Sequence, residues 1–280
     1  MSPNTEQHRP LNRARRHFLG VVFSTGVKVA AMSALVSTIF SLPARSMGTK
    51  WWNDNNDPGH SPGDSGQNCF LAGTLIMTPA GSVRIEDLQI GDLVETMRGQ
   101  AMPVKWIGRQ AYKKNGPSWS DSVMPIRISR QALDQKTPHA DLYLSPNHAL
   151  FIDGFLIRAK DLVNGLSIVP SLPAEREIID YLHIVLDTHE VIFAEGAPAE
   201  TFLLRSSNHE NFTNFVEFSR LYPAECRSAM VPFAPIVGYE GGREHLGALL
   251  RLAIPRFIHK EDPIRDACNR FAARARRTNA

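Results

Sequence analysis

The sequence predicts a mainly β protein in which a compact all-β body is followed by C-terminal helices. Between residues 69 and 204 many short apolar runs alternate with closely spaced Gly, Pro and Asp turns, which is typical of an all-β domain. After residue 204 the apolar spacing changes to that of helices. The 280 residues, 43% hydrophobic and 21% charged, have a globular composition that excludes disordered, coiled-coil and collagen-like chains.

Residues 1–46 are expected to be an export signal. A polar, basic start is followed by 25 mostly apolar or small residues (18–42), interrupted by Lys28. The pair Arg15-Arg16 just before this run resembles a twin-arginine signal. We therefore expect an exported protein, periplasmic or extracellular, that touches the membrane only through this segment. A retained anchor is the alternative, because the apolar run is long enough to span a bilayer.

The remainder of the chain is near neutral. Residues 1–46 hold six basic residues and one acid, which leaves 25 basic and 27 acidic residues for 47–280. No nucleic-acid partner is therefore expected. Residues 47–68 are rich in Gly, Asn, Asp, Ser and Pro, which predicts a flexible linker. An ordered body, residues 69–204, begins abruptly after it.

Short strands are expected along the body, with one helical turn at 84–88. The expected strands are 74–77, 93–96, 104–107, 125–128, 142–144, 149–152, 155–157, 166–169, 178–186 and 190–194.

The C-terminal extension, residues 205–280, is expected to be helical. Helices are expected at 211–218 and 243–253, and the last one is the clearest. Its apolar stripe is formed by Ile264, Ala267, Cys268, Phe271, Ala272 and Ala275. This stripe is expected to dock on the β body rather than on a membrane.

The three cysteines leave at least one thiol without an intramolecular partner. A Cys226–Cys268 disulfide is possible and would leave Cys69 as the free thiol. Cys268 lies on the apolar stripe, which predicts a packing role for it.

Three blocks of sequence carry a family resemblance. The body opens with Cys69, then Gly73-Thr74, a Pro-Ala-Gly turn at 79–81, I-E-D-L at 85–88 and G-D-L-V at 91–94. The second block reads L-Y-L-S-P-N-H at 142–148, and the third reads L-D-T-H-E-V-I-F-A-E-G-A-P-A-E at 186–200. In this order they resemble the Hint domain of hedgehog C-terminal domains, inteins and bacterial intein-like proteins. The resemblance covers 69–204 and implies a Hint-type horseshoe of many short strands.

The resemblance implies that Cys69 is the nucleophile of a self-cleavage reaction. Its thiol would attack the Asn68 carbonyl and form a thioester by an N-to-S acyl shift, with the upstream segment 47–68 as substrate and no cofactor. His148 is implied as the acid that protonates the leaving amine. Ser145, which replaces the usual Thr, would donate a hydrogen bond to the carbonyl or the oxyanion. The acceptor of the thioester would be water, a thiol or an amine.

His183 stands where the family usually has an acid, and Asp187 and His189 are candidates to substitute for that acid. If residues 178–189 form one unbroken strand, these three side chains share a face, which we expect to lie near Cys69. If Asp187-Thr188 forms a turn, this inference fails.

Splicing is not expected, because Glu200 and Thr201 occupy the positions of the His-Asn pair that ends an intein. N-terminal cleavage is the expected function. A non-catalytic exported Hint-fold binding or display module is the alternative. A peptidase acting on other proteins is disfavoured, since the order of the blocks indicates a self-acting domain.

Zinc binding is a further alternative. His183, Asp187 and His189 on one strand face, with His148 as a fourth ligand, could hold the ion. Their spacing matches no strong metal signature, so no metal is expected.

Overall fold

The computed structural model describes residues 68–173, 176–205, 208–223, 229–238 and 262–278. The predicted export signal, the linker apart from Asn68 and the predicted helix at 243–253 lie outside these ranges. None of the helices within them is long and apolar enough to cross a bilayer.

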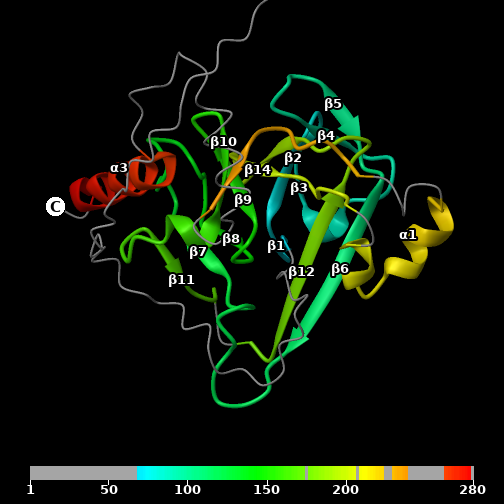
Figure 1. Cartoon of the computed structure of the whole chain (residues 1–280), viewed down its shortest axis with the longest axis horizontal. Coiled ribbons are helices and arrows are strands. Elements are labelled where there is room, and N and C mark those ends of the chain that lie inside the picture. The colour runs from blue at the N-terminus through cyan, green and yellow to red at the C-terminus, as the bar shows by residue number, and fades with distance from the viewer. Residues whose placement is uncertain (1–67, 174–175, 206–207, 224–228, 239–261, 279–280) are drawn as a thin grey trace, which may run out of the picture. The chain divides into compact units, whose positions relative to one another are not determined.

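Two sheets and a separate hairpin form the body (Figure 1). The six-stranded sheet has the order β11 (Ile168–Pro170), β7 (Ile126–Ile128), β8 (Leu142–Leu144), β1 (Phe70–Leu71), β12 (Ile178–Val185) and β6 (Trp106–Lys113). The seven-stranded sheet has the order β15 (Ile236–Val237), β10 (Phe155–Arg158), β9 (Ala149–Ile152), β14 (Ala197–Glu200), β13 (Val191–Ala194), β2 (Leu75–Thr78) and β3 (Gly81–Arg84). The hairpin joins β4 (Leu93–Glu95) to β5 (Ala101–Pro103).

The helices are few among the described residues. They are α1 (Phe215–Leu221), α3 (Pro263–Thr278) and the short 3-10 turns η1 (Ile85–Asp87), η2 (Ala159–Leu162) and η3 (Asn208–Asn211). The mainly β architecture predicted from the sequence is therefore confirmed.

The first strand lies inside the six-stranded sheet, between β8 and β12. It pairs antiparallel with both neighbours, with Phe70 opposite Leu144 on one side and opposite Leu182 on the other. Continuing these registers by one residue places Cys69 opposite Ser145 and opposite His183. The start of the predicted domain is thus held on both sides by strands that come from distant parts of the sequence.

Two tight hairpins build the middle of the seven-stranded sheet. Asp153-Gly154 joins β9 to β10, and Glu195-Gly196 joins β13 to β14. All four residues have positive φ, between 48° and 92°, as a two-residue type I′ turn requires. The second turn leads β14 back antiparallel to β13, so that Glu200 ends opposite Val191.

The main core fills the space between the two sheets. Phe70 and Leu182 from the six-stranded sheet and Leu150 and Ile192 from the seven-stranded sheet belong to one buried cluster. A second cluster contains Cys69, Leu71, Trp106, Tyr181, Val185, Phe202, Leu204, Phe212 and Phe218. Alternation along the strand explains the division, because successive side chains of β1 point to opposite faces.

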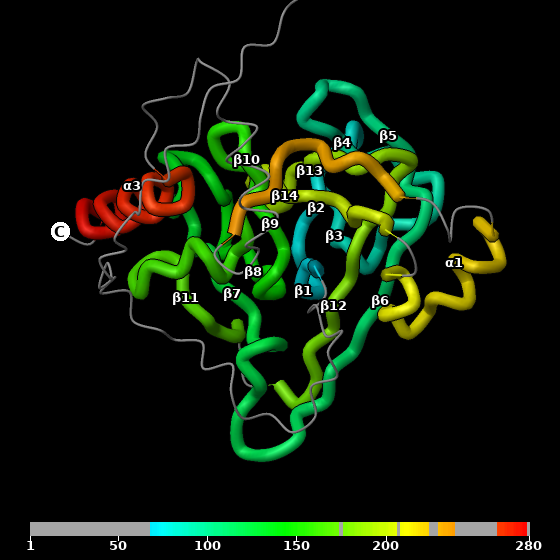
Figure 2. Tube along the Cα trace, in the orientation of Figure 1, coloured from blue at the N-terminus to red at the C-terminus, as the bar shows by residue number. Residues whose placement is uncertain are grey.

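Segments after residue 204 complete both cores. Phe218 of α1 packs against Trp106, with ring centroids 5.1 Å apart. The stretch 229–238, orange in Figure 2, ends in β15, which pairs parallel with β10.

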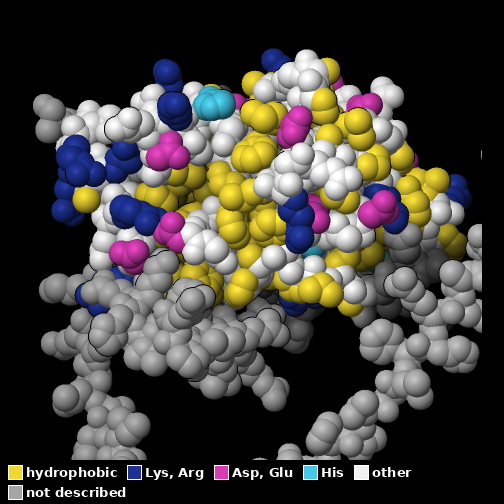
Figure 3. All heavy atoms as spheres, turned by 90° about the horizontal axis from the view of Figure 1, so that it is seen from above, with side chains coloured by type: hydrophobic (Ala, Val, Ile, Leu, Met, Phe, Trp, Pro, Cys, Tyr) yellow, Lys and Arg dark blue, Asp and Glu magenta, His cyan; other side chains and the backbone are white. Residues whose placement is uncertain are grey.

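The last helix docks on the β body, as the apolar stripe predicted. Ile264, Ala267 and Phe271 belong to the main core cluster. The Cys268 thiol donates a hydrogen bond to the Asp161 carbonyl (3.2 Å), and Cys268 is a free thiol in the structure. Cys226, its possible disulfide partner, lies outside the described residues. Basic side chains gather at the end of the molecule that α3 forms (Figure 3).

Most expected strands are present within one or two residues, and the differences have local causes. The run 104–107 was expected as one strand, but residues 104 and 105 lie between β5 and β6. The first helix begins at Phe215 rather than at 211 because η3 precedes it. Five strands were not expected: β1, β3, β5, β14 and β15. Of these, β14 has the sequence Ala-Pro-Ala-Glu, which has low strand propensity and is held by the hairpin instead.

Candidate active site

The peptide bond between Asn68 and Cys69 enters the fold at the head of β1. The Cys69 side chain is fully buried in the second cluster, beside Leu71 and Tyr181. Burial raises the pKa of the Cys69 thiol well above its ordinary value, because an apolar environment disfavours the thiolate. The thiol is therefore protonated at neutral pH, and its use as a nucleophile requires a group that takes the proton.

Ser145 holds the backbone of Cys69 from the end of β8. The Cys69 N–H donates to the Ser145 Oγ at 2.7 Å, and the Ser145 N–H donates to the Cys69 carbonyl at 2.9 Å. The hydroxyl was predicted to donate to the Asn68 carbonyl. The structure instead shows it as an acceptor on the other side of the same peptide bond, at the nitrogen that would leave.

His148 is completely buried one tight turn after Ser145. Its ring packs on Phe70, with centroids 4.3 Å apart, and on His183 at 4.9 Å. Neither ring nitrogen has a hydrogen-bond partner among the described residues. Burial lowers the pKa of His148 to about 4, and the nearby Glu200 carboxylate opposes this shift only in part. His148 is consequently neutral at physiological pH.

His183 lies on β12, on the opposite side of β1 from Ser145. It is fully buried, and its Nδ1 accepts a hydrogen bond from the Ile184 N–H at 3.1 Å. Within the described part of the chain its Nε2 has no partner. Burial, with contributions from His148 and His189, lowers the pKa of His183 well below its ordinary value. Two neutral imidazoles thus lie next to the first residues of the domain.

The chain bends at Asp187-Thr188, so the condition for one continuous polar face is not met. β12 ends at Val185, and Asp187 turns outward to pair with the Lys105 ammonium at 2.8 Å, with 65% of its side chain exposed. The predicted cluster of His183, Asp187 and His189 therefore has to be corrected, because Asp187 lies outside it.

His189 returns to the interior after this bend. Its Nδ1 accepts a hydrogen bond from the Phe233 N–H at 2.9 Å, which leaves the ring proton of the neutral form on Nε2. Nε2 lies 3.3 Å from the Glu200 Oε2, a close contact that does not have the geometry of a hydrogen bond. A surface cavity of about 470 Å³ is lined by His189 together with Arg98, Lys105, Asp187, Thr188, Glu190 and residues 229–232.

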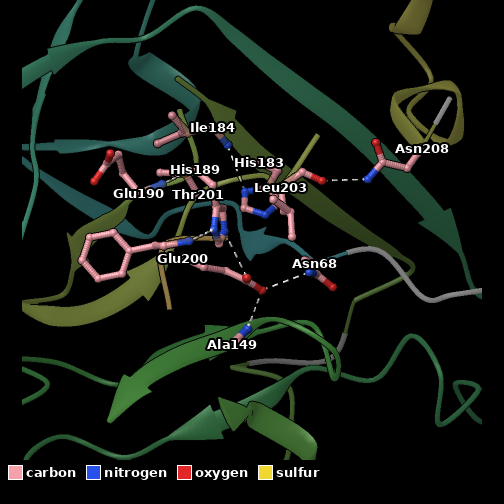
Figure 4. A network of polar contacts seen from close by, with 11 residues as sticks. Asn68, Ala149, His183, Ile184, His189, Glu190, Glu200, Thr201, Leu203 and Asn208 are labelled. Carbon is pink, nitrogen blue, oxygen red and sulfur yellow. Dashed lines mark hydrogen bonds and ion pairs between the residues drawn. The ribbon is translucent and has the colours of Figure 1, made fainter. Parts of the chain in front are cut away.

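Glu200 is a site residue that the sequence interpretation missed (Figure 4). Its carboxylate is buried, and its Oε1 accepts hydrogen bonds from the Asn68 Nδ2 and from the Ala149 N–H, both at 2.9 Å. The available signal was the third sequence block, which ends at this acid.

The four ligands considered for zinc are not all brought together. Across the described ranges, no group of three or more His, Cys, Asp or Glu side chains is arranged to hold a metal ion. Asp187, one of the four ligands considered, lies at the surface with Lys105.

Known proteins resemble this chain over its β body. The Hint domain family model matches residues 68–206. Similar solved structures include the bacterial intein-like domain from Clostridium thermocellum (15% identity, 49% of this chain, 99% of that chain, TM-score 0.35). They also include the gp41-1 intein (16% identity, 48% of this chain, 98% of that chain, TM-score 0.35). A DnaB intein from Synechocystis sp. is similar as well (13% identity, 49% of this chain, 100% of that chain, TM-score 0.34). No curated protein matches the sequence. The mainly β fold is a Hint fold, and the Hint domain family model matches the part of the chain, residues 68–206, that forms it.

Proposed function

We propose that this Hint domain cleaves its own chain between Asn68 and Cys69 through a thioester. The observation that carries the proposal is the hydrogen bond from the Cys69 N–H to the Ser145 Oγ at 2.7 Å, next to the buried His148. It holds the nitrogen of the bond that would break. The family match supports autoprocessing in general, and the steps below are specific to this site.

The acyl shift needs no external reactant. The Cys69 sulfur adds to the Asn68 carbonyl carbon, and the bond from that carbon to the Cys69 nitrogen breaks. The thiol proton ends on the nitrogen, which becomes a free amine, so atoms and charge balance. Because the amide is more stable than the thioester, the step depends on groups that protonate the nitrogen as it leaves.

His148 is suited to carry that proton. A pKa of about 4 makes the His148 imidazolium a strong acid towards the leaving nitrogen, whereas the neutral ring is a weak base towards the thiol. Ser145 contributes at the same nitrogen, since a hydroxyl that accepts from the amide N–H can also donate to the amine. The other buried polar side chains on this side of the Asn68–Cys69 peptide bond are His183, Glu200 and His189.

Cleavage is completed when water, a thiol or an amine attacks the thioester. Glu200 and Thr201 at the end of the third block cannot cyclise as the final Asn of an intein does, so the proposal is N-terminal cleavage without splicing. We also propose export through the twin-arginine route, directed by residues 1–46. After signal removal, the released segment would be residues 47–68.

The proposal is tested with the intact mass of the purified full chain, with and without added thiol. We expect wild type to divide into residues 1–68, or their processed form, and 69–280, faster with thiol. Cys69→Ala is the matched control and should stay whole. If wild type also stays whole under native conditions, self-cleavage is excluded there and the non-catalytic exported module becomes the better account.

A further inference from the structure

The Glu200 carboxylate contacts the residue that supplies the scissile carbonyl. Asn68 Nδ2 donates to its Oε1 at 2.9 Å, and the side chain of Glu200 is only 2% exposed. The two remaining contacts, from the Ala149 N–H and from His189 Nε2, belong to the body of the domain. The Asn68 amide is thus the contact that comes from upstream of the proposed nucleophile.

A buried carboxylate discriminates strongly among the side chains that face it. A carboxamide donates a hydrogen bond that compensates the lost hydration of the charge. An aspartate at position 68 has the same shape, but it would place a second carboxylate against the first, where like charges repel with little screening. An apolar side chain would leave the carboxylate with one donor fewer.

The Glu200 Oε1 connects residue 68 to the strand that follows His148, the proposed acid. Glu200 Oε1 accepts from the Asn68 side chain and from the N–H of Ala149, the residue after His148. β14, β9 and the segment that enters β1 therefore meet at one atom (Figure 4). Binding of the Asn68 side chain by Glu200 would therefore fix residue 68 relative to the strand that follows His148.

We propose that Glu200 forms a subsite that selects a neutral, hydrogen-bond-donating carboxamide at position 68 and rejects an acidic side chain there. Glu200 is a positioning residue in this assignment, since it acts through Asn68. The effect of the subsite on cleavage rests on the proposed function, whereas the pairing of the two side chains does not.

The test is an exchange of donor and acceptor in the full chain. Asn68→Asp should slow cleavage by roughly tenfold or more, because it replaces a charge-assisted hydrogen bond with repulsion. Glu200→Gln should also slow it. The double variant restores a donor–acceptor pair, since the Gln amide can donate to the Asp carboxylate, and should cleave faster than Asn68→Asp alone. A merely structural role for Glu200 would not produce this rescue.

Two controls keep the outcomes distinct. Asn164→Asp makes the same chemical change in a loop where the side-chain oxygen accepts backbone hydrogen bonds, and it should leave the rate unchanged. Asn68→Asp, Glu200→Gln and the double variant are also compared by thermal unfolding in a Cys69→Ala background, where no cleavage occurs. We expect the destabilisation of the double variant to differ from the sum of the two single effects. If wild type does not cleave, the proposed function fails and unfolding alone decides on the subsite. The subsite would be overturned if Asn68→Asp cleaved at the wild-type rate. It would also be overturned if the changes in unfolding free energy of the two single variants summed to that of the double variant.

Discussion

The backbone N–H of Cys69 is bound to the side-chain oxygen of Ser145 at 2.7 Å, across 76 residues of sequence. The hydroxyl of a residue at the end of β8 therefore holds the nitrogen that must leave if Cys69 forms a thioester. Because this N–H is buried, its partner affects stability as well as chemistry.

Ser145→Ala should lower both the cleavage rate and the stability. The loss leaves a buried N–H without its acceptor, which costs about 1–3 kcal/mol of unfolding free energy. We expect the rate to fall by roughly tenfold or more, measured by intact mass against time. Ser145→Thr keeps the hydroxyl and is the matched control. Equal rates for the Ala variant and wild type would contradict a role for this oxygen at the leaving nitrogen.

The free energy of unfolding should decrease as the pH falls from about 6.5 to about 4. His148 has a pKa of about 4 in the folded chain, below its ordinary value of 6.5, so the unfolded chain binds the proton first. The stability present above pH 6.5 is lost over this window, on the order of 3 kcal/mol for this residue. Burial of His183 acts in the same direction. Urea unfolding across the window should give a shallower pH dependence for His148→Gln, and an unchanged slope would contradict the assignment.

Cys69 should resist alkylation in the folded protein. Its side chain is fully buried, so the reagent cannot reach it, and burial raises the thiol pKa, so little of the reactive thiolate is present. Iodoacetamide labelling followed by peptide mass spectrometry should show modification of Cys69 at least about a hundredfold slower than in unfolded chain. Rapid labelling of the native chain would mean that the junction opens to solvent more often than this packing allows.

Asp187→Asn should have little effect, unlike substitutions at Glu200. The Asp187 carboxylate is largely exposed, and ion pairs with such a partner contribute about 0–1 kcal/mol. The Lys105 ammonium, which is mostly buried, keeps its place over the Tyr222 ring in the variant. We expect an unchanged cleavage rate and a melting temperature close to wild type. Loss of cleavage in this variant would mean that Asp187 acts in the site, although the bend at 187–188 turns its side chain away from it.

Phe271→Ala should strongly destabilise the domain through the last helix. Phe271 is 3% exposed in the main core cluster, and the loss of such a side chain costs about 3–5 kcal/mol. Arg276→Ala on the exposed side of the same helix is the control and should stay within about 0.5 kcal/mol of wild type. Urea unfolding of both variants measures the difference. Equal stabilities would show that α3 is not part of the cooperative unit.

Several features followed directly from local sequence pattern. Short apolar runs between turn residues predicted most strands, because a strand needs only alternation and β-favouring side chains over a few residues. The 3.6-residue stripe at Ile264, Ala267 and Phe271 predicted both the last helix and its docking face. The order of three motifs identified the Hint domain and directed attention to Cys69, Ser145 and His148.

The assembly of the site was decided by tertiary structure. A period-two argument placed Asp187 beside His183, but it holds only while the strand continues, and the chain bends after Val185. Glu200 reaches Asn68 because the Glu195-Gly196 turn folds β14 back against β13 and next to β9. The fold class followed from the sequence alone, and motif order pointed to Cys69, Ser145 and His148 as candidates, since both depend on local pattern. Which side chains meet at the junction depends on strand registers between distant segments, which no local pattern specifies.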